Sequence, residues 1–148
     1  MRVVIGYGLA VISSYIAGAV LVSQGNISRI TELGFEITLA QRFNSAGHDI
    51  MSMYSIYLPL IAVALLIAFV VAAQVIRRLP HLRLLGYTLA GFVGIMAIHL
   101  LLKQVVGISG IAPTRTLLGL IGQGAAGALG GVCFYWITQQ PSSPEADI

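Results

Sequence analysis

Charged residues are scarce in this sequence. Of its 148 residues, 9% are charged and 57% are hydrophobic, whereas a soluble domain carries about 25% charged residues. The mean hydropathy is +0.92, and a water-soluble fold this apolar would expose large apolar patches and aggregate. The composition therefore excludes an ordinary soluble domain and indicates a protein surrounded mostly by lipid.

Cysteine is almost absent. Cys133 is the one cysteine and lies within an apolar segment, which excludes an intrachain disulfide and a cysteine-based metal site. The histidines His48 and His99 lack the spacing of a metal motif, and a haem would require a second well-buried histidine. We therefore expect neither a metal nor any other cofactor.

Motifs for nucleotide binding or catalysis are also missing. The sequence contains no GxxxxGK motif, HExxH, GxSxG or CxxC. Its eight lysines and arginines stand at the ends of apolar segments and form no basic stripe with aromatics, so the net charge of +3 does not indicate nucleic acid. No acidic residue interrupts an apolar segment, which argues against an ion pump. No matched pair of segments is broken, which argues against an inverted-repeat transporter.

Four long apolar segments are present, at about 3–22, 54–76, 84–102 and 115–138. The second has 23 residues without a charge, and about 20 helical residues cross the roughly 30 Å hydrocarbon core. Tyr54 and Tyr57 would be interfacial aromatics and Pro59 would lie in the first turns of this span. Thr114 is the expected N-cap of the last helix.

The segment 23–52 is the only long polar stretch. Its apolar residues recur at helical spacing, which predicts one or two short amphipathic helices, either on the membrane surface or packed over the mouth of the bundle, with a break at 44–47. We therefore predict an all-α integral membrane protein. It has four transmembrane helices in an antiparallel bundle and an amphipathic interfacial segment between helices one and two. Residues 1–140 form a single domain and 141–148 a flexible tail.

Basic residues predict the orientation. Arg77, Arg78 and Arg83 crowd the short connection between spans two and three, which favours both termini in the cytoplasm of a bacterium, with the protein in its inner (plasma) membrane. The tripeptide 17–19 has the small-residue pattern of a signal-peptidase site. The first span is therefore either an uncleaved anchor, which we favour, or a cleaved signal.

The fourth span is rich in small residues, which allow helices to approach closely in lipid. We expect this stripe to pack inside the bundle, the alternative being the seam of a homo-oligomer. The predicted helix-packing residues are Gly119, Gly122, Ala126, Gly127, Gly130 and Gly131.

Topology places one group of polar residues on one membrane face, the shared polar face. Span two starts there, span three ends there and span four starts there. Ionisable groups at membrane depth are candidates for function. The catalytic candidates are His99, Asp49 and Arg115, and the ligand-binding candidates are His48, Lys103 and Gln123.

Each candidate also has a structural interpretation. His99 could bond Gln123 or a backbone carbonyl and so join two helices, and Lys103 could extend its side chain to the interface. Asp49 could cap the second helix or pair with Lys103 or Arg115.

The four-span layout with a long first loop resembles the outline of the membrane-associated eicosanoid and glutathione metabolism family. The segment 112–115 is similar to the one that opens that family's fourth helix. The family's pattern of Arg, His or Asn, and Glu before span two is not met by residues 42–44 and 48–49, so no glutathione site is carried over.

Three classes of function remain. We favour a non-catalytic accessory or assembly bundle, for which self-association through the fourth helix is one option. The alternatives are a channel or transporter component, and a membrane enzyme that acts on a lipophilic substrate at the shared polar face. The expected partners are the lipid bilayer and either a second copy or a subunit of a membrane complex, and no nucleic acid.

Overall fold

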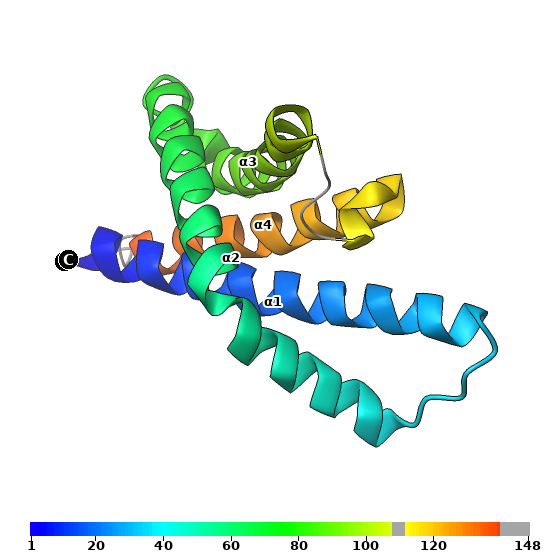
Figure 1. Ribbon diagram of the computed structural model, residues 1–148. Coiled ribbons are helices and arrows are strands. Elements are labelled where there is room, and N and C mark those ends of the chain that lie inside the picture. The colour runs from blue at the N-terminus through cyan, green and yellow to red at the C-terminus, as the bar shows by residue number, and fades with distance from the viewer. Residues whose placement is uncertain (108–111, 140–148) are drawn as a thin grey trace.

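The computed structural model describes residues 1–107 and 112–139, which form four long helices packed as a bundle (Figure 1). The helices are α1 (Arg2–Glu32), α2 (Leu39–Ile76), α3 (Arg83–Val106) and α4 (Leu117–Thr138). Short 3-10 turns, η1 (Pro80–Leu82) and η2 (Ala112–Arg115), precede α3 and α4. By length and composition all four helices could cross a membrane. The predicted all-α membrane bundle is confirmed, while the tail expected at 141–148 lies outside the described residues.

The helices are arranged as a ring in which each packs against two others. α4 lies between α1 and α3, and α2 packs against α1 and α3 from the other side. α1 and α4 lie side by side and run in opposite directions, whereas α2 crosses α1 (Figure 1). Large aliphatic side chains are exposed on the outside of the ring, among them Leu66, Val70, Val93, Leu101 and Leu129. This exposed apolar surface indicates an integral membrane protein in a lipid bilayer.

The centre of the ring is filled by apolar side chains. Ile61, Leu65 and Ile95 are completely buried. Towards the end where the chain begins, Phe69 stacks on Phe134 with ring centroids 4.7 Å apart. Stacked and edge-to-face aromatic pairs add to the free energy gained by burial, so this contact connects α2 to α4 across the centre of the ring.

Glycines on α4 allow its backbone to touch both neighbouring helices. Gly127 and Gly131 lie against α3, where a Cβ on Gly127 would overlap the carbonyl oxygen of Gly91. Gly130 lies against α1, where a Cβ would be 2.8 Å from the carbonyl oxygen of Ala10. Such contacts are what small residues make possible in lipid. This part of the small-residue stripe is therefore occupied by helices of the same chain.

The other small residues predicted to pack differ among themselves. Ala126 is buried. Gly119 lies in the first turn of α4, where its N–H donates to Thr116 Oγ1 at 3.1 Å. A Cβ on Gly122 would have only one neighbour, Leu21 Cδ1, at 3.7 Å, so the packing there is loose.

The segment 23–52 differs from its prediction. It forms the ends of two long helices, because α1 continues to Glu32 and α2 begins at Leu39, and it contains no separate surface helix. Gly34, with a φ of +90°, turns the chain away from α1. Thr38 then starts α2 through a capping box with Gln41.

The break expected at 44–47 is also wrong, because α2 is helical throughout this stretch. Polar contacts hold the two helix ends together: Ser23 Oγ donates to Ser45 Oγ at 3.0 Å, and an Arg42 guanidinium nitrogen donates to Gln24 Oε1 at 3.1 Å. At 1.5 Å per residue, α1 and α2 are roughly 46 and 57 Å long. Both exceed the roughly 30 Å thickness of the hydrocarbon core, so either tilt or extension beyond the core must accommodate the excess length.

Other helix boundaries move for local reasons. Because α2 starts early, Pro59 lies in its interior instead of in its first turns. α3 ends at Gly107, whose φ of +69° is that of a left-handed cap. α4 takes Thr116 as its N-cap, where Thr114 was expected. Thr116 is the residue placed directly before the first helical turn, so its hydroxyl can accept a backbone N–H of that turn.

A polar contact fastens the far end of α4. The Arg83 guanidinium donates to the Thr138 carbonyl oxygen and to Thr138 Oγ1, both at 2.9 Å. It also lies 6.0 Å from the centre of the Tyr135 ring, within the range of a cation–π contact. The start of α3 is thus tied to the end of α4.

Candidate functional site

Polar side chains are buried between the helices, in the half of the bundle that leads to the shared polar face. The buried polar residues there are Ser14, Tyr15, Ser23, Tyr57, His99 and Gln123. Burying a polar group in apolar surroundings costs free energy unless the group is hydrogen-bonded. The partners of each group therefore decide which of them hold the fold together and which remain available to a ligand.

Gln123 forms hydrogen bonds with two other helices. Its side chain is 0% exposed, its Nε2 donates to the Gly18 carbonyl oxygen at 3.1 Å, and its Oε1 accepts a hydrogen bond from the Tyr57 hydroxyl. A Cβ on Gly18 would lie 2.7 Å from that hydroxyl oxygen, so only glycine leaves room for the contact. These bonds join α1, α2 and α4 and favour a structural role for Gln123 over ligand binding.

Tyr57 and Tyr15 continue this network towards α2. The two rings have centroids 5.9 Å apart, and the Tyr15 hydroxyl donates to the carbonyl oxygen of Ile50. Tyr57 was predicted to be an interfacial aromatic, but it is 3% exposed, whereas Tyr54 is 61% exposed. A buried tyrosine hydroxyl needs a hydrogen-bond partner. Gln123 is the one amide at similar depth in the fourth span, so the sequence offered a signal for the Tyr57–Gln123 pair.

His99 is buried without a comparable partner. It is 6% exposed, and its ring centroid lies 5.9 Å from that of Tyr57. Its Nε2 is buried and has no hydrogen-bond partner among the residues that the structure describes. The amide expected to pair with it, Gln123, is bonded elsewhere. Since nearly all buried polar groups are hydrogen-bonded, this nitrogen is a point where a bound molecule would find an open position.

Two cavities meet at His99. The first, of about 210 Å³, is lined by His99, Leu100, Lys103, Thr114, Arg115, Thr116, Leu117 and Leu120. The second, of about 290 Å³, is lined by Ser52, Met53, Ser55, Ile56, Tyr57, Leu60, His99, Leu102 and Thr114. His99 and Thr114 belong to both, so the histidine stands between a basic cavity and a mostly apolar one.

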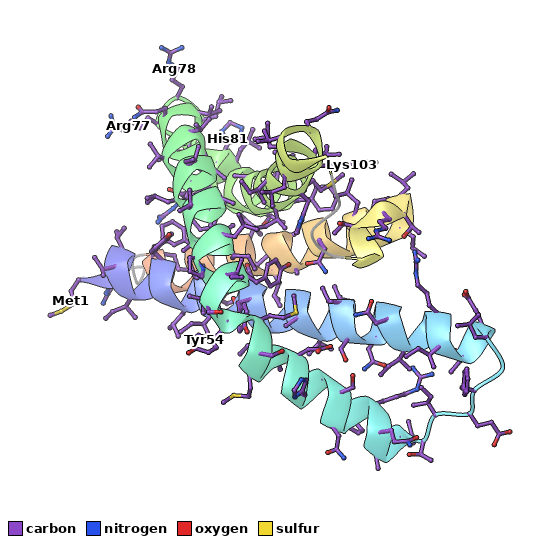
Figure 2. All side chains as sticks on the ribbon, in the orientation of Figure 1. Met1, Tyr54, Arg77, Arg78, His81 and Lys103 are labelled. Atoms are coloured by element: carbon purple, nitrogen blue, oxygen red, sulfur yellow. The ribbon has the colours of Figure 1, made fainter. Side chains whose placement is uncertain are left out.

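Three of the predicted face residues come together in the basic cavity. His99 and Lys103 are four residues apart on α3 and so lie on one side of that helix, as their spacing indicates. η2 brings Arg115 to the same cavity. Figure 2 shows Lys103 at the end of α3. No carboxylate is among the described residues that line either cavity, so the local charge favours an anion.

The structure does not bring His48 and Asp49 to this place. Neither residue lines a cavity that contains His99. His48 is exposed, and Asp49 lies in the interior of α2 and so does not cap it. Asp49 forms no ion pair with Lys103 or Arg115 in the described part of the chain. Both residues lie in the part of α2 that precedes the predicted second span.

Comparison with protein-family models, with curated proteins and with solved structures finds no match for this chain. The resemblance to the membrane-associated eicosanoid and glutathione metabolism family therefore gains no support from these searches. The function must be argued from the site alone.

Proposed function

We propose that the protein is a non-catalytic accessory bundle of the membrane, and that its cavities at His99 bind a compact anionic amphiphile. The observation that carries the proposal is the buried Nε2 of His99, which has no hydrogen-bond partner among the described residues. It lies between a cavity lined by Lys103 and Arg115 and a mostly apolar one. Concave sites with apolar walls and a few convergent polar groups are typical of ligand pockets.

The two cavities match the two ends of such a molecule. Lys103 and Arg115 would attract an anionic head, and an arginine is well suited to hydrogen-bond a phosphate or carboxylate. His99 would hydrogen-bond an oxygen of that head. Met53, Ile56 and Leu60 would contact the apolar part. The apolar cavity has a volume of about 290 Å³, at the lower limit of the 300–1,000 Å³ typical of drug-sized sites, which favours a compact ligand with one chain.

The alternatives have less support. A membrane enzyme would need an acid–base partner for His99, yet the carboxylate of Asp49 lies away from the cavities. A channel through one copy would have to displace Ile61, Leu65 and Ile95, which fill the centre of the ring. A binding role requires neither a second catalytic group nor a rearranged core.

The basic residues indicate the location of the protein in the cell, and the outer surface of α4 indicates where a second copy would bind. Arg77, Arg78 and Arg83 support an orientation with both termini in the cytoplasm and a bacterial inner membrane as the site. Because several glycines of α4 already contact α1 and α3, self-association through α4 would use its outward face, where Leu118 and Leu129 are exposed.

Thermal unfolding in a neutral detergent tests the binding proposal. Dodecyl phosphate should raise the melting temperature of the full chain, since a ligand that binds only the folded state stabilises it. Dodecanol should not. Lys103→Gln and Arg115→Gln should each reduce the shift, whereas Arg29→Gln, at an exposed cation in the last turn of α1, should leave it unchanged.

The opposite outcomes are equally clear. Equal shifts of the melting temperature with dodecyl phosphate and dodecanol would show that the anionic group does not contribute to binding. Mass spectrometry of the recovered amphiphile provides the second check, because release of dodecanol or inorganic phosphate would make the protein an enzyme and replace the non-catalytic role.

A further inference from the structure

A separate apolar groove runs along the outside of the α2–α3 pair. It has a volume of about 530 Å³ and contains none of the residues of the His99 cavities. Small residues such as Ala72, Gly86 and Ala90 belong to it together with exposed aliphatic ones such as Val71 and Val93. Along α2 the groove extends from Ala64 to Ile76, roughly 18 Å at helical rise. This is longer than one leaflet, about 15 Å of hydrocarbon.

The groove leads to a basic tip. Val75 and Leu79 line both the groove and a further cavity of about 530 Å³, whose other walls are Gln74, Arg77 and Arg78. Figure 2 shows Arg77 and Arg78 extending from the end of α2. The apolar groove, which is longer than one leaflet is thick, is thus continuous with a cationic pocket at the end of α2.

The two arginines at this tip differ from the third arginine of the same connection. Arg83, on the same connection, bonds Thr138. In contrast, Arg77 and Arg78 are exposed, and their guanidinium groups make no hydrogen bond or ion pair with the residues that the structure describes. Five guanidinium donors on each remain for an external anion.

We propose that the groove and the basic tip form a binding site for an anionic diacyl phospholipid. The phosphate would lie against Arg77 and Arg78, and one acyl chain would lie along the groove between α2 and α3. Basic pockets between transmembrane helices recognise anionic headgroups in this way. Charge complementarity, together with a groove that joins the basic pocket directly, selects a phospholipid over a second copy of this chain, whose α2–α3 tip would bring the same positive charges.

Native mass spectrometry of the full chain in neutral detergent tests the headgroup part. The probes are phosphatidylglycerol and phosphatidylcholine with identical acyl chains. Each basic residue near an anionic lipid contributes about fivefold in affinity, so phosphatidylglycerol should bind about thirtyfold more tightly than phosphatidylcholine. Arg77→Gln with Arg78→Gln should abolish the difference, and Arg2→Gln, at an exposed arginine remote from the groove, should preserve it.

The groove part has its own matched pair of variants. Val93→Trp places an indole in the groove and should weaken binding of both lipids. Val63→Trp, on α2 but outside the groove, makes the same change at a similarly exposed position (58% for Val93 and 54% for Val63) and should not. Glycerol phosphate, which has no chains, should not bind.

Several results would overturn the proposal. They are equal binding of the two lipids by the unmodified protein, undiminished phosphatidylglycerol binding by the double arginine variant, and binding of glycerol phosphate as tight as that of the lipid. A dimer signal that disappears in Val93→Trp would assign the groove to a second copy instead. Unchanged melting temperatures of the variants establish that they fold.

Discussion

Tyr57 donates a hydrogen bond to Gln123 and thereby joins α2 to α4 across the ring. These two helices are not adjacent, since each packs mainly against α1 and α3. The same amide also donates to the Gly18 carbonyl oxygen of α1, so one side chain connects three helices. In lipid, where helices gain little from hydrophobic burial, such a bond adds directly to the packing that holds them together.

Removal of either partner should lower stability. We expect Tyr57→Phe and Gln123→Leu each to reduce the free energy of unfolding by about 0.6 kcal/mol, the average for interhelical hydrogen bonds in membranes, and by no more than about 1.7 kcal/mol. The double variant should lose less than the sum, because the second change removes a bond already broken. Unfolding in mixed detergent measures all three. Tyr54→Phe is the control, and strict additivity would contradict the coupling.

Gly127 should tolerate no side chain. Gly127→Ala would bring its Cβ onto the Gly91 carbonyl oxygen and should cost about 1–3 kcal/mol through overpacking. Gly122→Ala makes the same change on the same helix where the nearest neighbour is 3.7 Å away. It should be neutral or stabilising, because alanine favours a helix by about 1 kcal/mol over glycine. Equal melting temperatures for the two variants would contradict the close contact of α3 and α4.

Arg83 should protect the end of α4. Arg83→Gln removes two hydrogen bonds to Thr138, and we expect a loss of about 1 kcal/mol for this partly exposed contact. Hydrogen exchange should become faster in the last turn of α4 while the centre of the helix stays protected. Arg29→Gln serves as the control. Uniformly faster exchange along α4 would indicate a global effect instead.

His99 should affect stability and binding in opposite directions. Replacing a buried, unpaired polar group by an apolar ring removes its desolvation cost, so His99→Phe should stabilise the ligand-free protein by about 1 kcal/mol. The same variant should lose the response to dodecyl phosphate. Melting temperatures with and without the amphiphile measure both effects. A strongly destabilised variant would show instead that His99 holds the bundle together.

Much of the fold was predictable because lipid constrains the backbone so strongly. Long uncharged runs such as 54–76 have few options other than a spanning helix. The polar segment 23–52 carried no such constraint, since its apolar spacing fits both a surface helix and an extension of a spanning one. The break expected at 44–47 was wrong because the small helix penalties of Asn44 and Gly47 are outweighed by contacts such as Ser23 with Ser45.

Only the part of the candidate site that depends on helix order was predictable from the sequence. Helix order places His99, Lys103 and Arg115 at one membrane face, and the structure brings these three to one cavity. The direction in which a helix is rotated is not fixed by topology, so His48 and Asp49 could not be excluded from the sequence. Tyr57 was missed because tyrosine is common at membrane interfaces, and its burial depends on Gly18 of another helix.

The joined ends of α1 and α2 have one more consequence. Because both helices are longer than the hydrocarbon is thick, we expect their linker at 33–38 to lie outside the hydrocarbon, on one side of the membrane only. An epitope placed in this linker would be reached by an antibody from just one side of a sealed vesicle. The hairpin thus offers a direct readout of which compartment the protein faces.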